Sequence, residues 1–153
     1  MNNDQLKEKI LAWFQDAEFP EKPTHFLTVT VGPEHLRALA EKLRYSDETL
    51  FDYMFCLTGV DMVNHLLVVY HLASTFHGHE MVMKVKISDR EDPEVDTLCD
   101  IWKTAEFHER EVYDLFGVKF KGHPDLRRIL LEDDWKGFPL RKDYKDEANI
   151  VEL

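Results

Sequence analysis

Hydrophobic positions repeat every three or four residues in three stretches of the chain, which predicts three amphipathic helices. The first covers residues 4–14. The second begins at Pro33, whose fixed backbone suits the first turn of a helix, and carries an apolar stripe on Leu36, Leu39, Ala40 and Leu43. The third is expected to be capped by Thr104 and to end at Gly117, with Val112, Leu115 and Phe116 on one face.

Apolar and polar residues alternate in four other stretches, which predicts strands at 25–31, 51–57, 66–75 and 80–87. The connections between the last three strands are short enough for antiparallel hairpins. Runs of strands stand beside separate helices, so the fold class is α+β: a two-layer domain with a mainly antiparallel sheet of about four strands packed against helices. Residues 89–94 are expected to form a charged loop, and Asp96 to begin a short helix that ends at Trp102.

Beyond Gly117 no helical or strand period continues, yet large apolar side chains are frequent. They are Phe120, Leu126, Ile129, Leu130, Leu131, Trp135, Phe138 and Leu140. A segment this apolar is not expected to be solvated and disordered in its working state. We therefore expect an α+β core domain at 1–117 and an extended C-terminal segment at 118–153 that docks on a partner subunit. In the isolated chain this segment would be sensitive to protease.

The charge of the chain is uneven along its length. The 153 residues suit one domain, and a net charge of −11 argues against a nucleic-acid or acidic-membrane partner. Residues 119–145, however, hold eight Lys or Arg against five Asp or Glu. Basic and aromatic residues there could form a groove for single-stranded nucleic acid, but the surplus is small and the rest of the chain is acidic. A polarised chain of this kind is expected to dock on a protein in one orientation.

Cysteine usage and hydropathy bear on the compartment. Cys56 and Cys99 lie far apart in the sequence and are expected to be free, buried thiols. The first ten residues lack the positive and apolar regions of a signal peptide. The longest apolar run, around 66–73, is far shorter than the roughly 20 residues that span a bilayer. We expect a protein without a membrane span in the reducing cytoplasm.

The residues that would bind a common cofactor are not found in the required pattern. The six glycines never approach the spacing of a dinucleotide-binding or phosphate-binding loop. Two distant cysteines cannot supply the four ligands that an iron–sulfur cluster generally needs. The sequence therefore predicts no cofactor in this chain.

Three histidines offer an alternative to that prediction. His71, His77 and His79 are expected near one end of the sheet, where neutral imidazoles could bind zinc or copper. A small autonomous metal-dependent enzyme is thus an alternative function, although His77 and His79 flank a glycine in a predicted turn, where polar residues are common. His108 and Glu109 resemble the start of a zinc-protease helix, but Val112 stands where the second histidine is needed.

Four carboxylates surround one cation on the third predicted helix. Arg110 has Glu106 and Asp114 one turn away on either side, with Glu109 and Glu111 beside it. Crowded carboxylates can perform acid–base chemistry, but a structural ion network centred on Arg110 is the favoured interpretation because no nucleophile or oxyanion donor is expected nearby. Arg110 should then be a partly buried hub that ties the helix to the C-terminal segment or to a partner.

Four motifs in the last third of the chain resemble a known family. They are Glu109-Arg110-Glu111, Tyr113-Asp114-Leu115-Phe116-Gly117, Gly122-His123-Pro124-Asp125-Leu126-Arg127-Arg128 and Pro139-Leu140-Arg141-Lys142-Asp143-Tyr144. In this order and spacing they closely resemble the signature of the C subunit, or 30-kDa subunit family, of respiratory complex I. Weaker echoes lie at 57–61 and 68–72. Where the family often has Ser before the helix and Asn-Trp before the Glu-Arg-Glu motif, this chain has Asp96 and Glu106-Phe107.

The resemblance implies a structural subunit in the hydrophilic arm of a proton-translocating NADH:quinone oxidoreductase, on the cytoplasmic side of the inner membrane. It implies that FMN and iron–sulfur clusters belong to neighbouring subunits. The chief partner would be the D subunit, which forms much of the quinone site, with the B and I subunits as further neighbours. The equivalent subunit of a related ferredoxin-dependent or hydrogenase complex is an alternative.

The motifs and the composition of the C-terminal segment give the candidate interface or signature residues, with no catalytic, cofactor-binding or metal-binding residue among them. These candidates are Glu109, Arg110, Glu111, Asp114, His123, Pro124, Arg127, Arg128, Trp135, Arg141, Lys142, Asp143 and Tyr144. The basic residues among them, Arg127, Arg128, Arg141 and Lys142, are expected to fix the register of the segment by binding carboxylates of the neighbour.

Overall fold

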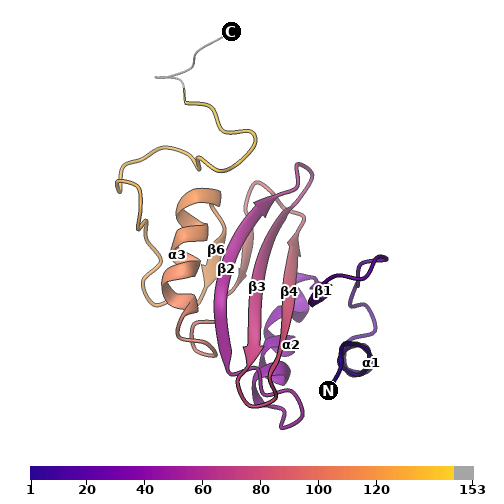
Figure 1. Ribbon diagram of the computed structural model, residues 1–153. Coiled ribbons are helices and arrows are strands. Elements are labelled where there is room, and N and C mark those ends of the chain that lie inside the picture. Colours follow the sequence, from indigo (N-terminus) through magenta and orange to yellow (C-terminus); the bar gives the residue numbers. More distant parts are fainter. Residues whose placement is uncertain (147–153) are drawn as a thin grey trace.

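A four-stranded sheet with helices packed against it, a short two-stranded sheet and an extended C-terminal segment make up the computed structural model (Figure 1). The structure describes residues 1–146; the end of the predicted C-terminal segment, 147–153, lies outside the described residues. The elements are α1 (Asn3–Trp13), β1 (Leu27–Val31), α2 (Pro33–Tyr45), β2 (Tyr53–Asp61), β3 (Leu66–Ser74), β4 (His79–Ile87), β5 (Glu94–Asp96), α3 (Ala105–Phe116) and β6 (Lys119–Lys121).

The larger sheet has the strand order β1-β4-β3-β2. β2, β3 and β4 form consecutive antiparallel hairpins, while β1 lies parallel to β4 at the edge. This confirms the predicted α+β class and the mainly antiparallel sheet. β2 is longer than predicted and runs on to Asp61, which brings this aspartate to the end of the sheet where the C-terminal segment passes.

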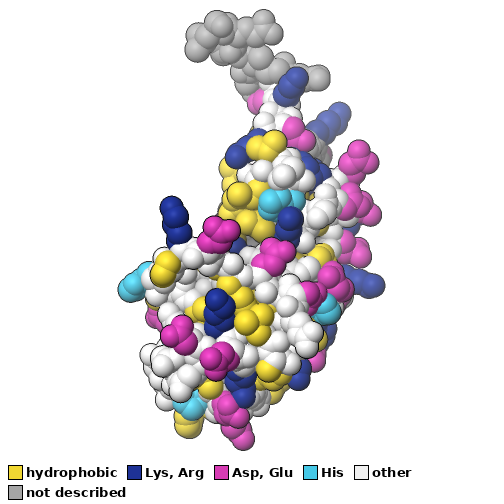
Figure 2. All heavy atoms as spheres, turned by 90° about the vertical axis from the view of Figure 1, so that its right-hand side faces the viewer, with side chains coloured by type: hydrophobic (Ala, Val, Ile, Leu, Met, Phe, Trp, Pro, Cys, Tyr) yellow, Lys and Arg dark blue, Asp and Glu magenta, His cyan; other side chains and the backbone are white. Residues whose placement is uncertain are grey.

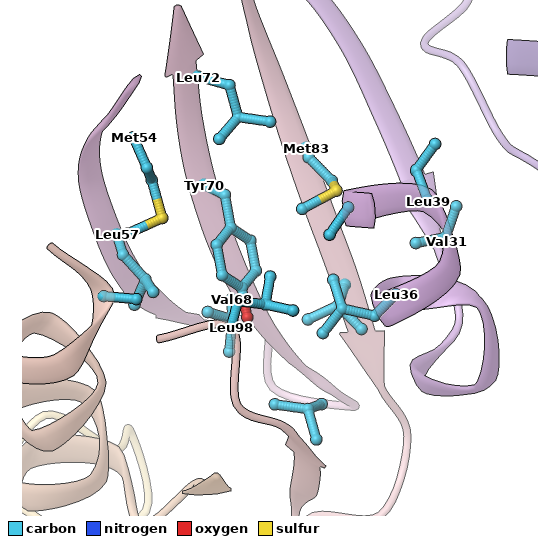
Figure 3. Close-up of a cluster of buried hydrophobic side chains, with 14 of the residues drawn as sticks. Val31, Leu36, Leu39, Met54, Leu57, Val68, Tyr70, Leu72, Met83 and Leu98 are labelled. Carbon is cyan, nitrogen blue, oxygen red and sulfur yellow. The ribbon is translucent and has the colours of Figure 1, made fainter. Parts of the chain in front are cut away.

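The core lies between one face of this sheet and the helices. Figure 3 shows buried side chains of β2, β3 and β4 on this face together with two from α2: Met54, Leu57, Val68, Tyr70, Leu72, Met83, Leu36 and Leu39. All four residues of the predicted α2 stripe are fully buried. Burying a leucine side chain contributes about 1.5–3 kcal/mol, so this stripe is a principal attachment of α2 to the sheet.

Helix α3 packs against β2, at the opposite edge of the sheet from α1 (Figure 1). A Cβ on Gly59 would lie 2.6 Å from the Phe116 ring, so the bare backbone of β2 allows the helix to come this close. α3 ends as predicted at Gly117, whose φ of 78° favours glycine. The predicted capping role of Thr104 is wrong, because its hydroxyl donates to the carbonyl of Met54 and thereby joins the helix to β2.

Two further predictions of local structure were wrong. The segment from Asp96 to Trp102 is not a helix: Asp96 ends β5, and the Leu98 carbonyl then accepts the N–H groups of Ile101 and Trp102 in a turn. The segment beyond Gly117 does contain a strand, β6, which pairs in parallel with β5 and buries Phe120 in the core. Three-residue strands are too short to show a period, so neither was visible in the sequence.

Within residues 1–146, none of the helices combines the length and the apolar composition that crossing a bilayer requires.

Candidate functional site

A buried aspartate on α3 holds the backbone of the C-terminal segment. Asp114 Oδ2 accepts the N–H groups of three successive residues, Ile129 at 3.2 Å, Leu130 at 2.7 Å and Leu131 at 3.0 Å. Its Oδ1 accepts Arg128 Nη1 at 2.8 Å. Burial tends to raise the pKa of Asp114, but the Arg128 guanidinium and the three N–H groups stabilise the carboxylate, so this pKa lies below its ordinary value.

Arg110 also binds the backbone of the segment. Its Nε donates to the Arg127 carbonyl at 3.1 Å and its Nη2 to the Arg128 carbonyl at 3.2 Å, and the residue is only 7% exposed. The predicted tie between the helix and the C-terminal segment is confirmed. The predicted ring of carboxylates is wrong: within residues 1–146 Arg110 forms no ion pair, because backbone carbonyls occupy its guanidinium.

A second aromatic and cationic group fixes the segment farther along. The guanidinium carbons of Arg128 and Arg141 lie 5.1 and 5.3 Å from the centre of the Phe138 ring. This ring packs directly on Gly117, where an added Cβ would lie 2.6 Å from it. Arg128 Nη2 also donates to the carbonyls of Trp135 and Gly137, both at 2.9 Å. Residues 129–138 thereby fold back onto the Arg128 side chain.

Arg141 and Leu140 join the next part of the segment to the body. Arg141 donates to the Phe116 carbonyl through Nε and to the Arg90 carbonyl at 2.9 Å through Nη1. The Leu140 N–H donates to the Leu115 carbonyl at 3.1 Å. Both Arg128 and Arg141 thus bind within the chain, and the expected contacts of these arginines with carboxylates of a neighbour stay a prediction.

The sequence analysis missed a second buried carboxylate that holds the segment, Asp61 at the end of β2. Asp61 forms a two-point ion pair with Arg90, and its Oδ2 accepts the Lys142 N–H at 2.8 Å. The Arg90 guanidinium, more than any other group, holds the pKa of Asp61 well below its usual range. Arg90 also lies 3.7 Å from the carboxylate of Asp143. The position of Asp61, an acidic residue at the end of an apolar strand, was the one feature of the sequence that could have indicated this role.

These contacts hold the backbone of the segment against the body and leave four of its large apolar side chains exposed. Leu130 is 64% exposed, and Ile129, Trp135 and Leu140 are exposed as well. We call these four residues the apolar surface of the segment. A groove of about 610 Å³ lies in the same segment, lined by Phe138, Arg141 and Tyr144 among others. Exposed apolar side chains on a backbone held in one conformation are typical of a preformed protein-binding surface.

A third buried carboxylate, on α3, lies close to the beginning of the segment. Glu109 is fully buried, where it accepts the Thr97 hydroxyl and, at 2.7 Å, the Leu98 N–H. Burial raises the pKa of Glu109 to about 7. His123 Nε2 lies 3.8 Å from this carboxylate, yet its hydrogen bond goes to the Glu106 carbonyl at 2.8 Å. The His123 Nδ1 accepts the Asp125 N–H at 3.0 Å, which leaves Nε2 to face the Glu106 carbonyl.

The remaining candidate residues lie at the surface. Glu111, Pro124 and the side chains of Lys142 and Asp143 are exposed. The Arg127 side chain binds only its neighbour Asp125 at 3.1 Å among the described residues, and both are largely exposed. Tyr144 is half-buried beside Gly137. Acidic and basic side chains both occur over the body and along the narrow upper part (Figure 2).

The three histidines of the metal hypothesis have other partners. The Nε2 atoms of His77 and His79 lie 2.9 and 3.2 Å from the carbonyls of Asp47 and Thr49, so both rings fasten the loop before β2. The His71 ring packs on Phe55. Among residues 1–146, the one set of possible ligand atoms within 4.8 Å of one another belongs to Asp16, Glu34 and His35. The arrangement thus favours a loop contact over a metal centre for His77 and His79.

Comparison with known proteins connects this site to a family. Residues 29–149 match the family described as "Respiratory-chain NADH dehydrogenase, 30 Kd subunit". The C subunit of the NADH-quinone oxidoreductase of Chloroherpeton thalassium is 50% identical over 111 residues, covering 71% of this chain and 46% of that protein. The C/D subunit of the Phocaeicola vulgatus enzyme is 47% identical over 126 residues, covering 82% of this chain and 24% of that protein.

The chain therefore spans less than half the length of these two relatives. The C subunit of the Roseiflexus castenholzii enzyme is 43% identical, and 73% of its length is covered. A solved structure with the same fold is a chain of the membrane-bound sulfane sulfur reductase, an archaeal respiratory membrane complex. It has a TM-score of 0.78 and 28% identity, covering 95% of this chain and 86% of that one.

Proposed function

The chain belongs to the family of the 30-kDa subunit of respiratory-chain NADH dehydrogenase, and from this we propose that it is a structural subunit of the peripheral arm of NADH:quinone oxidoreductase. It acts by supporting the D subunit in electron transfer from NADH to quinone. Relatives named as NADH-quinone oxidoreductase subunits reach 50% identity, against 28% for the sulfane sulfur reductase chain, which favours this function over the equivalent subunit of a related complex.

The observation that carries the proposal is the set of exposed apolar side chains on a backbone that the rest of the chain holds in place. Asp114, Arg110 and Asp61 bind the backbone of the C-terminal segment, and four of its large apolar side chains are exposed. Water is a poor environment for this surface, which a protein neighbour would cover. Because the segment is already ordered, docking costs less conformational entropy than folding a disordered tail would.

The D subunit is the proposed occupant of this surface. The name of the relative from Phocaeicola vulgatus joins C and D in one protein, which supports the view that the two parts work side by side. The B and I subunits are proposed as further neighbours. FMN and the iron–sulfur clusters are proposed to lie in neighbouring subunits, and proton transport to belong to the whole complex, held as a peripheral arm on the cytoplasmic side of the inner membrane.

Co-purification tests this proposal. The tagged chain, with Leu130→Ser and Trp135→Ala combined, is expressed in place of the native copy, and the D subunit recovered from solubilised membranes is measured relative to the tagged chain. We expect about tenfold less D and a matching loss of NADH:quinone activity. The isolated variant should melt like the original, because both side chains are exposed.

The matched control is Phe76→Ser. Phe76 is 81% exposed on the turn between β3 and β4, at the opposite end of the sheet from the C-terminal segment. This variant should recover D in the normal amount. Full recovery of D with the double variant as well would contradict the proposal.

A further inference from the structure

The turn between β2 and β3 exposes two apolar side chains in a backbone conformation that is unfavourable for one of them. Met62 is 46% exposed and Val63 is 65% exposed. Val63 has a φ of 74°, in the left-handed region that β-branched residues rarely adopt. Most of Val63 stays exposed within residues 1–146, so the described chain gains little burial and no relaxed backbone from this valine.

The conformation of this turn is nevertheless fixed. Asp61 Oδ1 accepts the Val63 N–H at 2.8 Å, and the Met62 N–H donates to the His65 carbonyl at 2.9 Å. Asp61 is itself buried and paired with Arg90. The two apolar side chains therefore stand on a rigid support and do not sit on a loose loop.

The same aspartate joins the turn to the C-terminal segment. While Oδ1 of Asp61 holds the Val63 N–H, Oδ2 holds the Lys142 N–H at 2.8 Å. The exposed Leu140 lies two residues before Lys142. Figure 1 shows the tip of the β2–β3 hairpin at the end of the sheet where the last described part of the segment passes. The hairpin tip thus continues the apolar surface of the segment.

We propose that Met62 and Val63 form a second contact with the D subunit, so that the docking surface consists of the segment and the hairpin tip held together by Asp61. This inference rests on the proposed function, because the occupant of the segment is taken to be the occupant of the tip. The continuity of the two surfaces at Asp61 favours one shared partner. Apolar side chains presented from a rigid turn suit an apolar pocket on that partner.

Val63→Gly separates this role from a role within the chain. Glycine adopts a φ of 74° without steric cost, so the isolated full-length variant should melt at the same temperature as the original or a few degrees higher. Recovery of D with the tagged chain from solubilised membranes should fall by about fivefold, because the apolar contact is lost. A stable chain that binds its partner less well is the expected result.

Met62→Ser should lower D recovery in the same way, and Phe76→Ser provides the control at the opposite hairpin. A photoactivatable cross-linking residue at position 63 gives a direct readout and should produce an adduct with D. Normal D recovery with both Val63→Gly and Met62→Ser would overturn the inference, as would an adduct with a different subunit alone. If the Leu130→Ser and Trp135→Ala variant loses D while both hairpin variants retain it, the hairpin inference fails and the proposed function stands.

Discussion

Asp114 and Arg128 form a buried ion pair, with 2.8 Å between Oδ1 and Nη1, that joins the last turns of α3 to the C-terminal segment. The rest of each side chain binds backbone: Asp114 takes three N–H groups, and Arg128 donates to the carbonyls of Asp114, Trp135 and Gly137. Two side chains thus provide partners that a helix or a sheet would otherwise supply to the backbone of the segment.

Replacing Asp114 should detach the segment. Asp114→Ala leaves the buried Arg128 charge and three N–H groups without their partner, and removal of one member of such a buried pair costs about 3–5 kcal/mol. Urea denaturation measures this loss, and limited proteolysis should show new cleavage between 127 and 137. Glu111→Gln, an exposed change on the same helix, should stay within about 0.5 kcal/mol of the original. Equal stability of the two variants would show that Asp114 does not hold the segment.

Replacing Arg110 should loosen the segment at its beginning. Arg110→Ala removes two hydrogen bonds from a charged donor to the carbonyls of Arg127 and Arg128, so we expect a loss of about 2–3 kcal/mol. Lysine keeps the charge but lacks the planar guanidinium that donates to both carbonyls at once. Arg110→Lys should therefore recover only part of the stability lost in Arg110→Ala. Differential scanning calorimetry of the three proteins checks the order. An Arg110→Ala protein with the melting temperature of the original would show that Arg110 does not hold the segment.

The buried carboxyl of Glu109 should make stability depend on pH near neutrality. Its pKa rises from 4.5 to about 7 on folding, so the folded state binds more protons than the unfolded state between these values. The free energy of unfolding should therefore fall as pH rises from 4.5 toward 7. Above pH 7 the titration of Glu109 should lower it no further. The whole effect amounts to about 3 kcal/mol.

Glu109→Gln isolates this effect, because the amide does not titrate. Urea midpoints at pH 5, 6, 7 and 8 should fall with pH in the original relative to the variant. The difference between the two proteins matters here, since burial lowers the pKa of His79 and of His65 and gives a slope of the opposite sign. Parallel pH profiles would mean that Glu109 keeps an ordinary pKa in the folded chain.

The two turn histidines should have only small, local effects. His79 packs on the Phe51 ring and binds the Thr49 carbonyl, so His79→Ala should cost about 1 kcal/mol, while the more exposed His77→Ala should stay within about 0.5 kcal/mol. Neither change should alter the activity of the complex. A chelator should leave the melting temperature of the chain unchanged, and a chelator-dependent loss of activity through these residues would restore the metal-enzyme alternative.

The sequence predicts those parts of the fold in which buried residues recur at the period of a helix or a strand. The α2 stripe and the alternation in β4 are visible because burial follows the period of the element itself. The C-terminal segment has no such period, since its backbone partners are side chains far away in the sequence, such as Asp61, which binds the N–H of Lys142. The family motifs marked Asp114 and Arg128 as important residues, but only the structure shows that they bind each other and the backbone.

Arg110 illustrates the same limit at a single residue. Helical spacing correctly placed Glu106 and Asp114 one turn away, but neighbours on a helix need not pair when a stronger partner is available. Asp114 binds the segment and Glu109 binds the loop after β5, so Arg110 is left to the carbonyls of Arg127 and Arg128. The described part of the segment is held at many points without a partner, so these contacts favour resistance to protease over the expected sensitivity, which stays to be tested.

Hydrogen exchange of the isolated full-length chain tests this central claim most directly. If the segment is a preformed docking surface, the amides of Ile129, Leu130 and Leu131 should exchange at least about a hundredfold more slowly than in an unstructured peptide, because Asp114 accepts all three. The protection should disappear in Asp114→Ala. Exchange of these three amides at the rate of an unstructured peptide in the original chain would contradict the account, since the segment would then become ordered only on its partner.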